Sequence, residues 1–218
     1  MIELMLTDGQ HRRAITCGAI LFDMDGTLVD STRCVEGTWQ AWATRHGLDL
    51  KSLLQVAHGR QNHDTIQLVA PHLNTPEEIA FLIRAEEDCR DGIIAVPGAL
   101  NLVSRLPLEC WAVVTSAWRR LAEIRLQCAG LPLPGVLVTA DEITRGKPQP
   151  DGYLAAAARI GIAPTSCLVF EDAPAGVEAA LAAGMSVVGI KTMFSQEQLG
   201  CELCIDDFQS ISVMGVSE

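Results

Sequence analysis

Seven residues at four separate places along the chain have the chemical types that phosphoryl transfer requires. They are Asp23, Asp25, Thr115, Ser116, Lys147, Glu171 and Asp172. Carboxylates that lie together repel one another unless a cation neutralises them, and Mg²⁺ prefers oxygen ligands and often binds substrate phosphate as well. Hydroxyl groups and a lysine ammonium supply the donors that a phosphoryl group needs. If the fold brings these residues together, they predict a magnesium-assisted phosphoryl-transfer site.

Two of these acids are suited to the reaction itself. Asp23 directly follows an apolar run, and a carboxylate at the tip of a strand can attack phosphorus to give an aspartyl phosphate. Asp25 can protonate the departing alkoxide and later deprotonate a water molecule. Gly26 allows the chain to turn sharply between them and the next segment. We therefore expect Asp23 to be the nucleophile and Asp25 the acid and base.

Short continuous apolar runs indicate strands that are buried on both faces. The runs are 18–22, 111–114, 136–138, 167–170 and 186–190. Helical periodicity lies between them, at 98–106, 118–129, 150–160 and 174–183. This alternation predicts an α/β fold with a Rossmann-like, doubly wound parallel sheet. Because ligands of such sheets bind beyond the carboxyl ends of the strands, the reactive residues are expected at one edge.

One long stretch interrupts the alternation. From about Ser31 to Ala95 no strand is expected, only helical segments at 32–46, 49–57, 62–70 and 76–90. A crossover between parallel strands needs only a dozen or so residues, so this stretch predicts an inserted all-α domain. The expected division is a core of residues 15–30 and 97–218, a helical insert of residues 31–96, and an N-terminal arm of residues 1–14 with no clear pattern and no assigned role.

Composition limits the partners. The 218 residues include 16 basic and 27 acidic side chains, a net charge of −11, which would repel a nucleic-acid backbone unless the basic residues were concentrated on one face. The sequence has no run of ~18 uncharged apolar residues and no basic leader before the first apolar residues. We expect no nucleic acid and no membrane as partner, a cytoplasmic location, and a monomer or weak homo-oligomer.

Eight cysteines are spread over the chain, and six of them stand alone in apolar sequence. Cys201 and Cys204 form one CxxC pair, but no second pair or nearby histidine completes a zinc site. The expectation is that the cysteines are reduced and act as small packing residues.

Four segments resemble the four ordered motifs of the haloacid dehalogenase superfamily. They are Asp23-Met24-Asp25-Gly26-Thr27, Val113-Val114-Thr115-Ser116, Gly146-Lys147-Pro148 and Phe170-Glu171-Asp172. The resemblance covers about residues 18 to 210. It implies a hydrolase core with a helical cap between the first and second motifs, which is the insert predicted above and is called the cap below.

Carried over residue by residue, the resemblance implies roles for each motif. Asp23 would be the nucleophile, Asp25 the acid and base, and Lys147 the neutralising cation. Thr115 or Ser116, with the following amide of Ala117, would hold the phosphate. The metal would be Mg²⁺, and its ligands would be Asp23, the backbone carbonyl of Asp25, and Asp172, with Glu171 binding directly or through water.

The resemblance also implies a substrate class. Relatives that keep an acid at the position of Asp25 are phosphatases and phosphomutases, and the likeness is to bacterial sugar phosphatases, so we expect a small phosphorylated sugar or polyol. In these relatives a loop of the cap contacts the sugar and recognises it. At that loop stand His58, Gly59, Arg60 and Gln61, and Glu36 lies in the first cap helix. Alternatively, these are ordinary polar residues at a helix junction.

Two rival functions remain open at this point. The sugar phosphomutases that the chain resembles, of the β-phosphoglucomutase type, have a histidine twelve positions after the nucleophile, where this chain has Val35, so hydrolysis is favoured over isomerisation. A signalling receiver module also combines acids, a hydroxyl, a lysine and Mg²⁺ on a doubly wound sheet. It would form a stable phosphoaspartate without turnover, but receivers lack a helical insert of this size.

Overall fold

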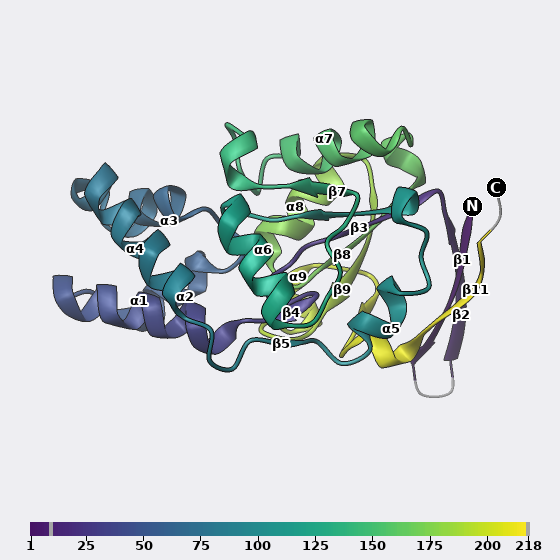
Figure 1. Cartoon of the computed structure of the whole chain (residues 1–218), viewed down its shortest axis with the longest axis horizontal. Coiled ribbons are helices and arrows are strands. Elements are labelled where there is room, and N and C mark those ends of the chain that lie inside the picture. The colour runs from purple at the N-terminus through teal and green to yellow at the C-terminus, as the bar shows by residue number, and fades with distance from the viewer. Residues whose placement is uncertain (9–10, 217–218) are drawn as a thin grey trace.

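The central feature of the protein is a six-stranded parallel sheet, in a computed structural model that describes residues 1–8 and 11–216 (Figure 1). Its strand order is β10-β9-β8-β3-β6-β7. The strands are β3 (Ala19–Phe22), β6 (Trp111–Val114), β7 (Val136–Val138), β8 (Cys167–Glu171), β9 (Ser186–Ile190) and β10 (Cys204–Ile205). The predicted α/β fold with a doubly wound parallel sheet is confirmed, and five of these six strands lie where the apolar runs predict them.

Helices cover both faces of the sheet, which is why the strands are continuously apolar. They are α5 (Ala99–Val103), α6 (Arg119–Cys128), α7 (Asp151–Ile160), α8 (Pro174–Ala182) and the short α9 (Gln196–Leu199). Every residue of β3, β6 and β8 is buried. Phe22 stacks on Phe170 with ring centroids 5.4 Å apart on one face, and Tyr153 of α7 is buried on the other. Short 3₁₀ helices lie at Pro71–Leu73, Leu108–Cys110, Ala140–Glu142, Pro164–Ser166 and Phe208–Ser210.

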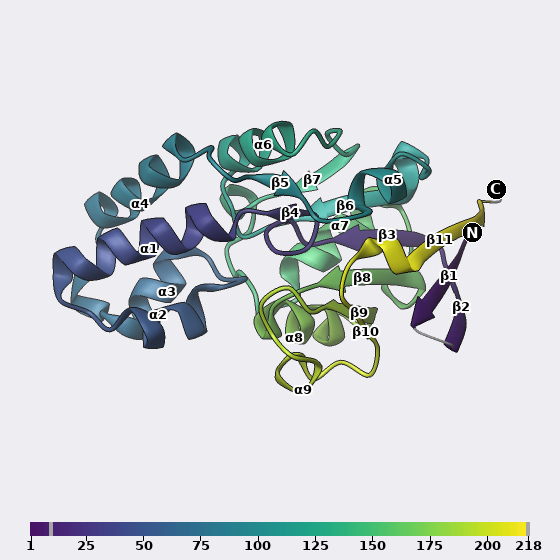
Figure 2. The same ribbon diagram turned by 90° about the horizontal axis from the view of Figure 1, so that it is seen from below.

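The cap consists of four helices that lie to one side of the sheet (Figures 1 and 2). They are α1 (Thr32–His46), α2 (Leu50–Ala57), α3 (Asn62–Val69) and α4 (Pro76–Asp88). Their apolar faces form a separate core around Trp42, Leu53, Ile66 and Leu82. Thr75 caps α4 by accepting a hydrogen bond from the Glu78 N–H.

The two segments that join the cap to the core pair with each other. Strand β4 (Val29–Asp30) runs antiparallel to β5 (Ile94–Ala95). The expectation that the stretch to Ala95 contains no strand was therefore wrong at its end, because a two-residue strand is too short to leave a periodic signal. The precise bounds of core and cap stay a prediction.

The N-terminal residues are strands rather than an arm without pattern. Strands β1 (Ile2–Asp8), β2 (His11–Cys17) and β11 (Ile211–Val216) form an antiparallel sheet in the order β11-β1-β2. Ile2, Leu4 and Leu6 are buried while Glu3 is exposed. This alternation is typical of a sheet with one buried face and one solvent-exposed face. Within the predicted arm, residues 9–10 lie outside the described part of the chain.

The cysteines divide into two groups. Cys34 of α1 and Cys89, directly after α4, form a disulfide with their Cα atoms 5.7 Å apart, so the expectation that all cysteines are reduced was wrong for this pair. Their proximity arises from the return of the chain to the core and has no signature in their spacing. Cys201 and Cys204 are free and buried in a small apolar cluster with Val177 and Leu199, as predicted.

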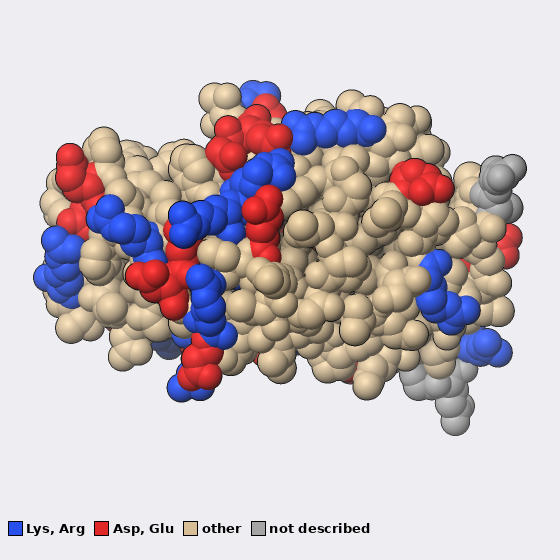
Figure 3. Space-filling model, viewed as in Figure 1, with Lys and Arg blue, Asp and Glu red and all other residues tan. Residues whose placement is uncertain are grey.

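Surface charge follows the boundary between cap and core. On the face shown in Figure 3, basic and acidic side chains interleave there instead of forming a basic surface. Arg120 of α6 pairs across the boundary with Glu87 of α4 at 3.4 Å. Among the described residues, none of the helices combines the length and apolar character needed to cross a membrane.

Candidate active site

The first reactive loop is placed by the carboxyl end of β3. The Asp23 N–H donates to the Phe170 carbonyl at 3.0 Å, which continues the pairing of β3 with β8 by one residue. Gly26 then turns the chain with φ of 82°, and its N–H donates to the Val29 carbonyl at 2.7 Å. A Cβ atom at Gly26 would overlap the carboxylate of Asp172. Glycine is therefore needed here both for the backbone conformation and for the close approach of the fourth motif.

Lys147 lies between two carboxylates in the interior. Its Nζ contacts Asp23 Oδ1 and lies 2.7 Å from Glu171 Oε1, and all three side chains are at most 5% exposed. Glu171 has further partners, because the Tyr153 hydroxyl donates to Oε1 at 3.0 Å and the Ala173 N–H donates to Oε2 at 2.9 Å. Both oxygens of Glu171 are thus occupied by protein donors, so this residue fixes Lys147 beside Asp23.

Three buried carboxylates at this sheet edge can hold a cation. One oxygen each from Asp23, Glu171 and Asp172 lie within 4.8 Å of one another. Hydroxyl groups orient Asp172, since Thr27 donates to Oδ1 at 3.2 Å and Thr192 donates to Oδ2 at 3.4 Å. Oxygen-only ligands at close quarters suit a hard divalent cation, so the residues present fit a metal site.

Burial of these charges shifts their proton affinities. Burial raises the pKa of Asp23 to about 8, against the lowering effect of Lys147. Burial and the charge of Glu171 raise the pKa of Asp172 well above its usual value. Although burial lowers the pKa of Lys147, the charges of Asp23 and Glu171 outweigh it and raise that pKa. The acids therefore crowd more negative charge into the interior than Lys147 alone balances, and a bound cation would relieve the excess.

Asp25 lies in the same loop and points to different partners. The Ser31 hydroxyl donates to its Oδ1 at 2.6 Å, and Arg125 Nη1 lies 2.8 Å from its Oδ2. Arg125 belongs to α6 and is only 3% exposed. Arg125 has no signal in the sequence that marks it as a site residue, because a lone arginine in an amphipathic helix carries no motif.

A cavity between core and cap brings most of the predicted site residues together. The core contributes Asp23, Asp25, Thr115, Ser116, Ala117 and Asp172 to its lining, and the cap contributes His58, Gly59 and Arg60. Core and cap also touch there, because the Ser116 hydroxyl donates to the Gly59 carbonyl at 2.9 Å. The Thr115 hydroxyl accepts the Ala117 N–H at 3.0 Å, which closes the turn after β6.

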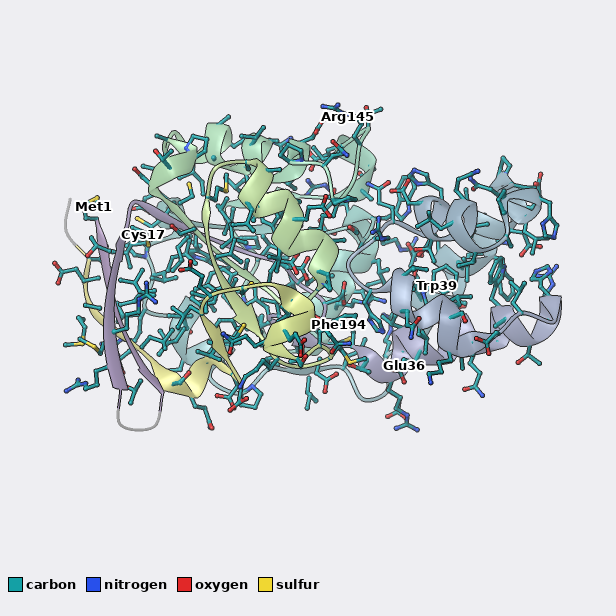
Figure 4. All side chains as sticks on the ribbon, turned by 180° about the vertical axis from the view of Figure 1, so that it is seen from behind. Met1, Cys17, Glu36, Trp39, Arg145 and Phe194 are labelled. Carbon is teal, nitrogen blue, oxygen red and sulfur yellow. A yellow bond between two sulfur atoms is a disulfide. The ribbon has the colours of Figure 1, made fainter. Side chains whose placement is uncertain are left out.

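Two predicted cap residues lie elsewhere. Gln61 is buried next to Gly146 and lines a smaller hollow behind Lys147. Glu36 is not among the described residues that line the main cavity, although it lies on α1 near the core, as does the lining residue Trp39 (Figure 4). Lining residues that sequence reasoning missed include Asn62, Glu86, Trp118, Arg125 and Met193.

His58 is prepared for a polar partner. Its Nε2 atom is buried and has no hydrogen-bond partner among the described residues. Burial lowers the pKa of His58, although Glu36 and Asp25 oppose the shift. The ring lies edge-on to Phe194, with centroids 6.1 Å apart. A neutral imidazole lining the cavity can exchange hydrogen bonds with a hydroxyl group.

The fold and this site together define an α/β protein with buried acids at the carboxyl edge of its parallel sheet and a helical cap over them. Residues 17–184 match the family model described as haloacid dehalogenase-like hydrolase. The chain belongs to this family, as the motifs predicted.

Relatives of the chain act on phosphate esters according to their names. It is 40% identical to hexitol phosphatase A of Escherichia coli over 90% of this chain and 94% of that protein. It is 34% identical to glycerol-1-phosphate phosphohydrolase 2 of Saccharomyces cerevisiae, with 93% and 87% covered. The predicted enzyme class, a hydrolase of phosphoric monoesters, is confirmed.

Solved structures share the architecture. A hydrolase from Pseudomonas syringae matches with a TM-score of 0.80 and 27% identity over 89% of this chain and 95% of that one. A putative β-phosphoglucomutase from Bacteroides vulgatus matches with a TM-score of 0.75 and 30% identity over 90% and 86%. Core and cap together are therefore common to hydrolases and to a putative mutase.

Proposed function

We propose that this chain hydrolyses the phosphate ester of a small sugar or polyol, with the carboxylate of Asp23 as the nucleophile. One observation carries the proposal: Asp23 lines the cavity under the cap while Lys147 holds it from the interior. A carboxylate in this place can reach the phosphorus of an ester that enters between core and cap. The names of the hexitol and glycerol phosphate relatives support the substrate class.

Mg²⁺ is the cation that we propose for the site. Asp23, Asp172 and the backbone carbonyl of Asp25 would hold it, and it would supply positive charge that stabilises the phosphoryl oxygens. Glu171 would act through water, because protein donors already occupy both of its oxygens. The three converging carboxylates support this assignment.

The chain's own residues would orient and protonate the substrate. Lys147 neutralises the charge of Asp23 and of the transferred group. Thr115, Ser116 and the Ala117 amide would hold the phosphoryl oxygens once a bound phosphate replaces the contacts of the Ala117 N–H with Thr115 and of the Ser116 hydroxyl with Gly59. Asp25 gives a proton to the leaving oxygen and takes one from the attacking water.

The sugar or polyol, which is the leaving group, would contact the cap. His58, Gly59 and Arg60 line the cavity opposite the phosphoryl site, so we propose that they contact the sugar or polyol. Gln61 would support this loop from behind, next to Gly146. Glu36 would contribute through its charge on His58.

A phosphomutase is the second candidate, favoured by the structural match to the putative β-phosphoglucomutase. Val35, at the position of the mutases' histidine, lines the cavity and offers no polar atom. Hydrolysis releases free phosphate, whereas a mutase returns the phosphate to another position of the sugar, so product analysis separates them. A receiver module would instead hold its phosphoryl group without turnover.

A panel of phosphorylated sugars and polyols tests the proposal, with free phosphate as the readout. We expect release from at least one hexitol, hexose or glycerol phosphate. Release should stop when divalent metal is chelated and return when Mg²⁺ is added. Activity that is unchanged by chelation would contradict the metal, and a relocated ester without free phosphate would favour the mutase.

We further propose that the protein works in the cytoplasm, as a monomer or weak homo-oligomer. Cytoplasmic thiol systems keep most cysteines reduced, and Cys201 and Cys204 are free thiols. Cys34 and Cys89 form a disulfide, which a reducing compartment would open. A cytoplasmic location therefore predicts that both are thiols in rapidly quenched cells, and an intact disulfide there would contradict it. Sedimentation of the purified chain tests the oligomeric state.

A further inference from the structure

One buried arginine connects the acid and base of the site to the cap. Arg125 of α6 directs Nη1 to Asp25 Oδ2 at 2.8 Å and Nη2 to Glu86 Oε1 at 3.2 Å. Glu86 belongs to α4 of the cap and is 8% exposed. The second carboxylate oxygen of Glu86 accepts a hydrogen bond from the Asn62 amide of α3 at 3.0 Å. The guanidinium thus bridges a core loop and helix α4 of the cap, and Glu86 in turn connects it to α3.

The geometry of the guanidinium makes this bridge directional. Its planar fork presents donors in fixed directions, so two carboxylates can be bound at once only if both are correctly placed. Because Arg125 and Glu86 are buried, their charges are poorly screened by solvent and depend on each other. Removal of Arg125 would leave the buried Glu86 without a charged partner, whereas removal of Glu86 would leave Arg125 paired with Asp25 alone.

The same bridge fixes the orientation of Asp25. Arg125 binds one carboxylate oxygen of Asp25, and the Ser31 hydroxyl binds the other at 2.6 Å. Ser31 directly follows β4, at the first segment that joins core and cap. Both residues that hold Asp25 therefore lie at the boundary, and one of them is itself held by the cap.

We propose that Arg125 is a positioning residue for the phosphatase reaction, which orients Asp25 and, through Glu86, makes that orientation depend on the docking of the cap. The inference rests on the proposed role of Asp25 as acid and base. It adds that cap position and proton transfer are linked by one side chain. If Arg125 only stabilised the fold, its substitution would affect the contribution of Asp25 to catalysis no more than that of the other site residues.

The test compares substitutions at both ends of the bridge. Arg125→Lys keeps the charge but offers a single ammonium that cannot reproduce the fork, and Glu86→Gln removes the charge of the cap partner while keeping its shape. Glu87→Gln is the matched control, because Glu87 follows on the same helix and pairs with Arg120 at the surface. For each variant kcat and KM are measured on the best sugar phosphate, together with inhibition by inorganic phosphate.

We expect Arg125→Lys to lower kcat by about 10²-fold and Glu86→Gln by about tenfold, because small misplacements of a catalytic group are costly. KM and the inhibition constant of phosphate should stay within about threefold, since Asp23, Thr115 and Lys147 keep their contacts. Glu87→Gln should match the wild type. Equal losses in kcat and in phosphate binding would show general damage to the site and overturn the proposal.

The decisive arm places the same changes in an Asp25→Asn background. If Arg125 acts through Asp25, Arg125→Lys should lower the residual kcat by less than about twofold there, because coupled residues are not additive. A loss as large as in the wild type would overturn the inference. If Arg125→Lys does not fold, as judged by circular dichroism, Glu86→Gln must show the same dependence on Asp25 or the inference fails. Wild-type activity of Asp25→Asn would instead refute the proposed acid and base.

Discussion

The core side of the cavity and the cap loop opposite are built in contrasting ways. In the core, Asp23, Lys147, Glu171 and Asp172 come from separate loops and strand ends, are almost fully buried and hold one another through several contacts. In the cap, residues 58–61 form a connection between α2 and α3. His58 Nε2 has no partner among the described residues.

The contrast separates chemistry from recognition. A charge network on buried strand ends is rigid, because every member would be left uncompensated if another moved. A loop over a rigid scaffold tolerates change in shape and sequence. We infer that the core sets the reaction and that the cap sets which sugar or polyol is accepted.

Loss of the buried ammonium group of Lys147 should have the largest combined effect on activity and stability. Lys147→Met would leave Asp23 and Glu171 facing each other in the interior, so we expect a ~10³-fold loss of kcat and a free energy of unfolding lower by about 3–5 kcal/mol. Phosphate release and urea denaturation measure the two effects. Lys51→Met, at an exposed position of α2, is the control, and wild-type behaviour of Lys147→Met would contradict the account.

A methyl group at the first turn should disturb the core through geometry alone. Gly26→Ala forces a side chain into positive φ and into the carboxylate of Asp172, and we expect a loss of kcat of about 10²-fold. Gly47→Ala is a matched control, because Gly47 also has positive φ but open space around it. Gly47→Ala should lose about 1 kcal/mol of stability, and Gly26→Ala should lose more because of the overlap with Asp172. Equal activity of the two would show that close approach to Asp172 is unimportant.

The cap should depend on its disulfide for stability rather than for chemistry. Replacing both Cys34 and Cys89 by serine removes a link between residues 55 positions apart, and we expect a loss of about 2–4 kcal/mol. Proteolysis of the cap and thermal denaturation measure it, with the exposed free thiol of Cys128 replaced by serine as control. A change of kcat beyond about threefold, larger than a distant structural change should cause, would contradict the separation of roles.

The smallest effect is expected at the cap loop of residues 58–61. Arg60 lines the cavity, so Arg60→Ala should raise KM for the preferred sugar phosphate about tenfold, as loss of one charged hydrogen bond predicts. Its kcat and its inhibition by inorganic phosphate should hardly change. Arg84→Ala, at an exposed position of α4, is the control. Unchanged KM in Arg60→Ala would leave the loop without the proposed role.

Much of the core could be predicted because its signals are local. Continuous apolar runs marked β3, β6, β7, β8 and β9. The predicted site residues of the core lie in the segments that follow the carboxyl ends of these strands. The terminal sheet was missed because β2 begins His11-Arg12-Arg13 and its partner β11 comes from the other end of the chain.

Contacts between segments that lie far apart along the chain could not be predicted from the sequence. Cys34 meets Cys89, and Arg125 meets Asp25 and Glu86, only after the cap has returned to the core. Nothing in the spacing of these residues distinguishes them from other cysteines or arginines. For the same reason the sequence predicted most of the lining residues that the core contributes, but missed several that the cap contributes.

The central claim is that Asp23 receives the phosphoryl group, and a mass measurement tests it directly. The enzyme is mixed with Mg²⁺ and a sugar phosphate that it hydrolyses, and the reaction is quenched in acid within the first turnover. The protein is then digested, and the masses of its peptides are measured by mass spectrometry. We predict one added phosphoryl group on the peptide that contains Asp23, absent in Asp23→Asn, whose kcat should fall by at least ~10⁴-fold. Rapid turnover with no phosphoryl group on that peptide, or full activity of Asp23→Asn, would contradict the account.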